Sequence, residues 1–270
     1  MRRGNGNSQV IEPIAMFAAA PRGENPATIP NEDSQGFEFD ETSLFLRNRF
    51  PGFDRVDGGE RVDYGLRAAY YGDKGGSTRV LVGQSYDWAV NPNFLPGSGL
   101  DHRLSDVVGR VTLSPTPYLD LVYRFRLDHA DLALRRQEVV ASVGPSNLRL
   151  GLSYLQIAAI PTIPLPAQRQ ISATLQAQLT RYWSLQLLET RNLGSAAAPV
   201  TAAGTPITTL STTATLNSGL ALTYRDECVA FVTSLTQSGI VVGDVKPGTS
   251  LVFTIVFKNL GDIGSTLATF

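Results

Sequence analysis

The 270-residue sequence contains one cysteine and two histidines, and this scarcity excludes several kinds of site. Cys228 has no second cysteine in the chain, so an internal disulfide is impossible. Two histidines and one thiol are little material for a zinc or iron centre. A serine hydrolase needs a histidine beside its nucleophile, whereas His102 lies in a Gly/Asp-rich stretch and His129 in a predicted tight turn. We therefore expect no catalytic residue, no metal ligand and no cofactor.

Charge of one sign and long apolar runs are also lacking. The 23 basic and 24 acidic residues give a formal net charge of −1, and nucleic-acid binding would call for a basic patch or stripe. No segment has the roughly 18 consecutive apolar residues of a membrane helix. The apolar stretch near the N-terminus carries Glu12 and Pro13, unlike the uninterrupted core of a signal peptide. Composition alone suggests a soluble protein, but a transmembrane β-barrel also has ordinary average hydropathy because its strands alternate.

Alternation of apolar and polar residues is what the sequence has in abundance. In YLDLVYRFRLDH (118–129), apolar side chains occupy every second position, and Asp120, Arg124, Arg126 and Asp128 lie between them. Successive side chains of a strand point to opposite faces, so one face would be apolar and the other densely charged. The pattern recurs at 148–154, 171–180, 213–224 and 250–258, and we find no convincing amphipathic helix.

Turn sequences divide these runs into about twelve predicted strands, most near the roughly 9–11 residues that cross a membrane on a tilt. Short turns alternate loosely with longer Pro/Gly-rich connections at 91–99, 160–166 and 194–206. Aromatic residues gather near strand ends, as in the interfacial girdles of membrane barrels. A soluble β-sandwich would alternate too, but here the apolar faces are uniform along their length. The pattern favours an antiparallel transmembrane barrel with lipid outside and a polar lumen inside.

A series of motifs makes this prediction more specific. QVIEPIAMFAAAP (9–21) is followed by IPNED (29–33) and by SLFLRNRFPGFDRVDGGERVDYGLR (43–67). GQSY (83–86), YRDECVAF (224–231) and KPGTSLVFTIVFKNLG (246–261) follow in order. Together these motifs resemble the LptD (Imp/OstA) family of lipopolysaccharide-assembly proteins of the Gram-negative outer membrane. RNRFPGFDR is the most specific of them, whereas the two adjacent cysteines of many relatives are reduced here to Cys228.

The resemblance implies an all-β fold: the C-terminal portion of an antiparallel barrel of the cell outer membrane, incomplete and open, without the family's N-terminal jelly-roll domain. The expected boundaries are an irregular segment 1–8, the barrel portion 9–262 and a C-terminal tail 263–270. The implied function is lipopolysaccharide transport and insertion into the outer leaflet. The implied partners are lipopolysaccharide, outer-membrane lipid, an LptE-type lipoprotein plug and, through the absent N-terminal region, a periplasmic LptA-type bridge. The alternatives are a passive porin-like channel and a soluble β-sandwich binding module.

Arginines are the candidate contacts to lipid phosphates in the lumen, because a guanidinium fork binds phosphate bidentately. The candidates are Arg47, Arg49, Arg55, Arg67, Arg124 and Arg126. The competing interpretation is structural: Asp54 and Glu60 would pair with the loop arginines, and Phe50, Pro51 and Phe53 would pack the loop into the lumen. We favour the structural interpretation for the RNRFPGFDR loop and a mixed-charge lumen for the strands.

The resemblance also assigns roles to the C-terminal region. As the last barrel strand, 251–258 would form one lip of a lateral opening, and its lip residues would be Leu251, Phe253, Ile255 and Phe257. Cys228 would form a disulfide with the absent N-terminal region, since in the family the cysteine at this hairpin ties the barrel to the periplasmic domain. The alternative for Cys228 is a small buried residue.

Overall fold

The computed structural model describes residues 2–4, 6–21, 25, 30–34, 38–160, 167–194, 214–239, 247–257 and 261–269. All regular elements in these residues are β-strands, and none of them is a helix that could cross a membrane. The strands are β1 (Arg2–Gly4), β2 (Asn7–Ala20), β3 (Gly59–Tyr71), β4 (Ser77–Asp87), β5 (Val107–Thr116), β6 (Leu119–Leu127), β7 (Leu134–Val143), β8 (Leu148–Ile157), β9 (Gln168–Gln178), β10 (Trp183–Asn192), β11 (Ala214–Arg225), β12 (Val229–Ser238), β13 (Gly248–Phe257) and β14 (Gly261–Thr269).

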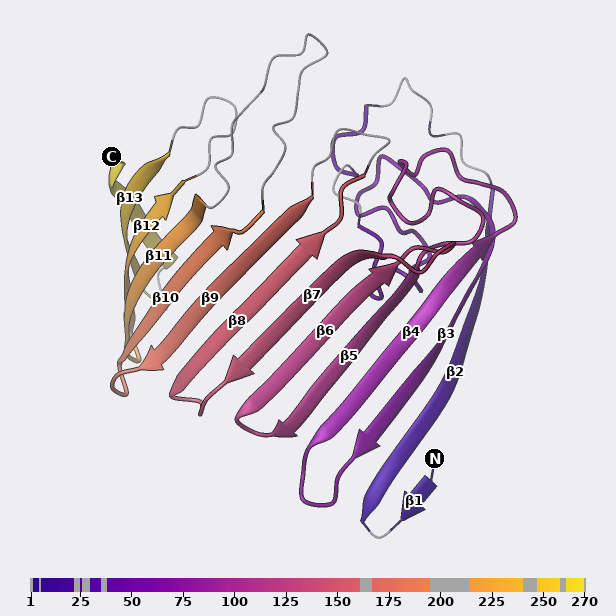
Figure 1. The fold of residues 1–270 in the computed structure, drawn as a ribbon. Coiled ribbons are helices and arrows are strands. Elements are labelled where there is room, and N and C mark those ends of the chain that lie inside the picture. The colour runs from indigo at the N-terminus through magenta and orange to yellow at the C-terminus, as the bar shows by residue number, and fades with distance from the viewer. Residues whose placement is uncertain are drawn as a thin grey trace. The chain divides into compact units, whose positions relative to one another are not determined.

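All fourteen strands belong to one sheet, in which each strand neighbours the next along the chain (Figure 1). The strand order is linear and ends at β1 and β14, and no pairing of described residues joins these two strands. The all-β class and the open sheet are therefore confirmed, and β2 to β13 correspond to the expected twelve or so strands. A β-sandwich would instead need two sheets packed face to face.

Two segments that the sequence suggested were irregular contain strands. Segment 1–8 holds β1, which folds back on the beginning of β2 with Arg2 opposite Gln9. Most of the expected tail belongs to β14, which pairs with β13 from Gly261 to Thr269 across a bulge. The glycines of GDIGSTLAT obscure the period-two pattern, and backbone pairing with β13 decides the structure instead. Strand 251–258 is therefore not the last strand.

The connections alternate in length along the chain. Residues 72–76, 117–118, 144–147, 179–182 and 226–228 form short turns, whereas 21–58, 88–106, 128–133, 158–167, 193–213 and 239–247 are longer. Because neighbouring strands are antiparallel, the short turns within a unit share one end of its strands. This is the arrangement of barrels with short periplasmic turns and longer external loops.

The chain divides into two compact units. Unit 1 comprises 1–116, 121–139 and 157–165, and unit 2 comprises 117–120, 140–156 and 166–270. In unit 1, the connections after β2 and β4 gather at one end of β2 to β5 (Figure 1). Their apolar side chains form a core against the sheet, made of Phe39, Leu44, Phe50, Phe94, Leu100 and, from β5, Val108. The core therefore lies between loops and sheet.

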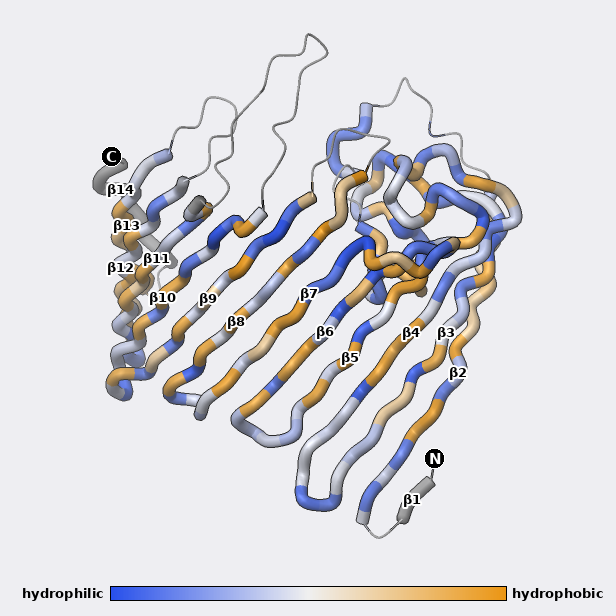
Figure 2. The backbone as a smooth tube through the Cα atoms, viewed as in Figure 1, coloured by the Kyte–Doolittle hydropathy of each residue, from blue (hydrophilic) through white to orange (hydrophobic). Residues whose placement is uncertain are grey.

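The strands of unit 2 separate apolar from polar residues by face. The register places five leucines side by side across β9 to β13: Leu175, Leu187, Leu220, Leu235 and Leu251. The residue next to each leucine along its strand points to the opposite face. These neighbours also lie side by side across the five strands: Gln176, Gln186, Ala221, Ser234 and Val252. Figure 2 shows the resulting alternation of hydrophobic and hydrophilic residues along the strands.

Candidate functional site

The connection between β2 and β3 is held in shape by two aspartates that bind each other's backbone. Asp33 accepts hydrogen bonds from the N–H groups of Phe53 (2.8 Å) and Asp54 (3.1 Å). Asp54 accepts in return from Glu32 (2.8 Å) and Asp33 (3.1 Å). The hydrogen bonds from Phe53 and Asp54 lower the pKa of Asp33 to about 2. We call this pair the aspartate clasp, and it joins IPNED to FPGFDR.

Gly52 leaves room for the clasp. A Cβ atom on Gly52 would lie 2.1 Å from Oδ1 of Asp33, closer than any real contact. Asn48 holds the other side of the loop, where its Oδ1 accepts from the N–H groups of Phe50 (3.2 Å) and Asp57 (3.1 Å). These motif residues therefore shape the loop itself.

Below the loop lies a buried network of charges, which we call the arginine network. Its members are Arg49, Asp57, Arg61, Asp63, Ser85 and Asp87. Arg61 binds Asp57 (2.9 Å) and Asp63 (3.1 Å), and Arg49 binds Asp57 through Nε and Nη2. Removing one partner of such a buried pair leaves an uncompensated charge and costs about 3–5 kcal/mol. The network therefore fixes the loop to β3 and β4.

The loop's packing differs in part from the prediction. Arg49 pairs with Asp57, and Asp54 belongs to the aspartate clasp. Phe50 packs inward as predicted and stacks on Phe94 with ring centroids 4.8 Å apart. Phe53, however, is 97% exposed and Pro51 is exposed as well, because the clasp turns this tip away from the core.

Two facing glycines let the loop approach the strands. Gly65 of β3 lies opposite Gly83 of β4. A Cβ at Gly65 would lie 3.3 Å from the ring of Phe45, and one at Gly83 only 2.5 Å from Leu44. The loop side chains thus occupy the space above the glycines. The loop therefore covers the face of β3 and β4 on which a Cβ of Gly65 or Gly83 would lie.

The same loop is attached to strands further along the sheet. Glu41 lies 3.2 Å from Arg124 of β6 and 3.9 Å from Arg110 of β5, and burial raises its pKa. Glu38 pairs with Arg136 of β7. We call the face that carries Arg124 and Arg126 the charged face and the opposite one the apolar face. Sequence reasoning missed the two glutamates, because nothing in their local pattern indicates that the loop reaches β7.

The six predicted phosphate contacts are in different environments. Arg49 and Arg126 are buried; Arg126 donates to the carbonyls of Gly97 and Ser98 and lies 3.5 Å from Asp106. Arg124 is held between Glu41 and Glu138. Arg55 binds the carbonyl of Asp54 (3.0 Å), Arg67 pairs with Glu12 (3.1 Å), and Arg47 is exposed. The structure does not gather them into one site, and their contact with phosphate stays a prediction.

Charged side chains of unit 2 also share a face of their strands. Asp120 shares β6 with Arg124 at even positions, and it pairs with Arg149 of β8. Arg149 also donates to Ser142 of β7 (2.6 Å). Thr174 of β9 lies close to where a Cβ of Gly151 would be, which assigns even positions of β9 to this face. The leucine row of Leu175 therefore lies on the apolar face.

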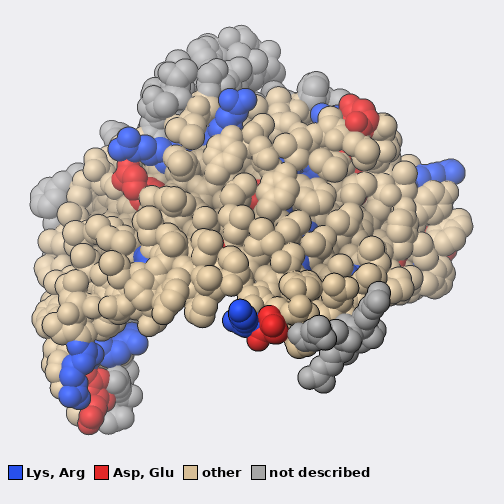
Figure 3. Space-filling model, turned by 60° about the horizontal axis from the view of Figure 1, so that its bottom comes forward, with Lys and Arg blue, Asp and Glu red and all other residues tan. Residues whose placement is uncertain are grey.

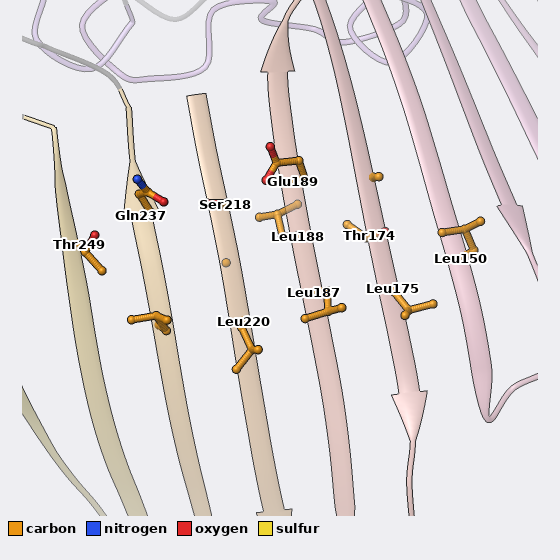
Figure 4. A pocket seen from close by; sticks show the side chains of 13 residues that line it. Leu150, Thr174, Leu175, Leu187, Leu188, Glu189, Ser218, Leu220, Gln237 and Thr249 are labelled. Carbon is orange, nitrogen blue, oxygen red and sulfur yellow. The ribbon is translucent and has the colours of Figure 1, made fainter. Parts of the chain in front are cut away.

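The apolar face has a shallow groove in unit 2. It has a volume of about 480 Å³, and leucines of β8 to β12 line it together with Glu189 and Gln237 (Figure 4). Glu189 binds Arg191 (2.8 Å) near the end of β10. A space-filling view shows a broad surface with few charged side chains, which gather near its margins (Figure 3). Sequence reasoning did not single out Glu189 or Arg191.

The predicted gate residues and Cys228 also have defined positions. The side chains of Leu251, Phe253, Ile255 and Phe257 share the apolar face of β13, but β14 pairs with the outer edge of this strand. Cys228 is exposed in the turn between β11 and β12, and its N–H donates to Asp226 (2.8 Å). The turn position disfavours the buried alternative, whereas the disulfide stays a prediction.

An open antiparallel sheet with one apolar face, one charged face and loops folded onto the charged face is the architecture of part of a membrane-type β-barrel. The family model LptD, described as LPS transport system D, matches residues 2–183. The chain belongs to this family.

Curated relatives agree with this assignment. LPS-assembly protein LptD of Pseudomonas fluorescens is 32% identical over 46% of this chain and 13% of its own length. The LPS-assembly proteins LptD of Alcanivorax borkumensis and Polaromonas sp. are 33% and 23% identical over 31% and 54% of this chain, respectively. These alignments cover 11% and 18% of those two relatives. The matches thus span a small part of much longer proteins.

Proposed function

We propose that this chain is the C-terminal part of an outer-membrane barrel that transports lipopolysaccharide and inserts it into the outer leaflet. The observation that carries the proposal is the family match over residues 2–183, which includes the aspartate clasp, the arginine network and the two-faced strands. The family description names a transport system, and we propose no catalytic step for the chain.

The two faces suggest how the parts of the substrate separate. The apolar face meets membrane lipid, whereas the charged face lines a lumen through which phosphorylated sugars pass. Acyl chains leave through a lateral opening at the C-terminal end of the sheet, where β13 and β14 form one lip. Unpaired backbone groups cost several kcal/mol each in lipid, so this seam is short or weakly paired.

Partners complete the proposed machine. An LptE-type lipoprotein would fill part of the lumen, and a periplasmic LptA-type bridge would deliver lipopolysaccharide to the N-terminal region of the full-length protein. The short turns would face the periplasm and the longer connections the outside.

Site-specific photo-crosslinking in cells tests the proposal. A photoreactive amino acid at Gln176, on the charged face, should capture lipopolysaccharide during transport. Leu175 is the matched control, because it lies on the apolar face three residues before the end of β9 at Gln178. At about 3.3 Å per residue it is roughly 10 Å from the short-turn end, where phospholipid surrounds the barrel.

Adducts are detected by immunoblotting for lipopolysaccharide. Cells that synthesise lipopolysaccharide are compared with cells in which its synthesis has been stopped. We expect a lipopolysaccharide adduct at Gln176 that disappears when synthesis stops. At Leu175 we expect adducts with phospholipid and none with lipopolysaccharide. Equal lipopolysaccharide adducts at both positions, or none at Gln176, would contradict transport along the charged face. No adduct together with ion conductance by the purified protein would support the porin-like alternative.

A further inference from the structure

Both histidines of the chain lie side by side in unit 1. The rings of His102 and His129 have centroids 4.5 Å apart, although one residue belongs to the connection before β5 and the other to the turn after β6. Asp101, Asp106 and Asp128 join them around a pocket of about 160 Å³. The aspartate clasp uses none of these five side chains, and neither does the arginine network.

Three potential ligand atoms converge in this pocket. Nδ1 of His129 lies 3.6 Å from Oδ1 of Asp106 and 3.9 Å from Oδ1 of Asp128. These separations are longer than those of ordinary hydrogen bonds. They are slightly longer than the roughly 3.3–3.5 Å between ligands placed about 2.0–2.2 Å from a tetrahedral Zn²⁺ ion. The ligand atoms of Asp106, Asp128 and His129 all lie within 4.8 Å of one another, and the three side chains would move closer together around a bound ion.

The far oxygen of each carboxylate is held by an arginine. Nε of Arg126 lies 3.5 Å from Oδ2 of Asp106, and Arg135 donates two hydrogen bonds to Oδ2 of Asp128 (2.7 and 2.9 Å). Each Oδ1 accepts one backbone N–H, from His129 or Ala130, and keeps a second lone pair. Outer groups of this kind orient carboxylate ligands in metal sites.

His102 is the candidate for a fourth ligand. Its Nδ1 lies 3.5 Å from Oδ1 of Asp101, whose other oxygen accepts from the N–H of Gly97 (2.9 Å). A carboxylate beside Nδ1 favours a proton on that atom and leaves Nε2 of the imidazole for a metal. The His102 side chain is 60% exposed, and its ring lies beside that of His129, with centroids 4.5 Å apart.

We propose that His102, Asp106, Asp128 and His129 form a zinc site that fastens the connection before β5 to the turn after β6. Two imidazoles and two carboxylates suit tetrahedral Zn²⁺, whereas Ca²⁺ and Mg²⁺ prefer six or more oxygen ligands. The zinc site does not depend on the proposed transport function. Binding of the ion can be measured whether or not the chain transports lipopolysaccharide.

Isothermal titration calorimetry tests the site with ZnCl₂ and the full chain, folded in detergent and free of any histidine tag. One Zn²⁺ per chain should bind, and Co²⁺ in its place should show the visible absorption of a tetrahedral complex. His102→Ala and His129→Ala should each weaken binding by tenfold or more, and Asp101→Asn by about 10- to 100-fold. Asp73→Asn, in the turn between β3 and β4, is the control and should leave binding unchanged.

Unchanged affinity in the variant that lacks both histidines would place any bound zinc elsewhere and overturn the proposal. Displacement of Zn²⁺ by an equal concentration of Ca²⁺ or Mg²⁺ would also overturn it, because it would show an oxygen-only site. If His129→Ala does not fold, the exposed His102→Ala decides, and full affinity in that variant counts against the site.

Discussion

At the scale of single residues, the motifs that resemble the family are explained by how they shape a loop. Asn48, Gly52 and Asp54 serve the loop's own backbone, and Arg49 anchors it in the arginine network. The most specific motif of the sequence is thus structural in the first place. Its contribution to transport would be to keep the loop folded onto the charged face.

Gly83→Ala should loosen this loop, because the new Cβ would lie 2.5 Å from Leu44 and 2.7 Å from the carbonyl of Tyr64. Overpacking of this kind costs about 1–3 kcal/mol. Gly219→Ala is the matched control, since the nearest atom there is 3.8 Å away, and we expect a change within about 0.5 kcal/mol. Urea unfolding in detergent measures both, and equal midpoints for the two variants would contradict the packing described.

The aspartate clasp should respond to pH only in strong acid. The pKa of Asp33 is lowered to about 2 from 3.8, so its contribution is complete above pH 3.8 and is lost as the pH falls through about 2. Carbon-13 NMR of the labelled carboxyl group should show this titration. Gly52→Ala would displace the carboxylate and return its pKa toward the ordinary value. An ordinary pKa in the unaltered protein would argue against the clasp.

At the scale of the strand, the two faces carry different side chains. Leu175 belongs to a row of leucines on the apolar face, and Gln176 faces the other way, opposite Gln186. In β6, Arg124 reaches loop carboxylates, whereas Phe125 lies on the apolar face, where a Cβ at Gly109 would meet its ring. The face assignments made from alternation agree with this separation.

Leu175→Arg should destabilise the protein in lipid by up to about 2–4 kcal/mol, the cost of a lipid-facing arginine at the bilayer midplane, which falls toward the interfaces. Gln176→Leu should change the free energy of unfolding far less, because the charged face lines the lumen in the proposed barrel. Folding titrations into phospholipid vesicles compare the two. If Leu175→Arg left stability unchanged while Gln176→Leu prevented folding, the assignment of the two faces would be inverted.

At the scale of the whole molecule, the sheet has two free ends and one exposed thiol. In the linear order from β1 to β14, the outer edges of the two end strands pair with no other described strand. In the proposed full-length barrel, further strands would continue the sheet beyond β1. Cys228 lies at the short-turn end, the proposed periplasmic side, where disulfides persist.

Cys228 should form a disulfide with the N-terminal region in the full-length protein. A bridge that closes a long loop stabilises by roughly 4–5 kcal/mol in the chain-entropy model and would orient the periplasmic domain. Non-reducing electrophoresis should show faster migration than under reduction, and Cys228→Ser should remove the difference. Unchanged mobility and unchanged lipopolysaccharide export in Cys228→Ser would mean that no such bridge forms.

The sequence by itself determined the strand class, the faces and the family, because period-two alternation and ordered local motifs are properties of neighbouring residues. It missed β14, since Gly261 and Gly264 weaken the alternation and only pairing with β13 makes this segment a strand. Tertiary structure alone decided the partners of the charges: Arg49 with Asp57, Glu41 with Arg124, and His102 beside His129. These residues lie far apart in the chain or carry no local pattern, and they meet because the loops fold back onto one face of the sheet.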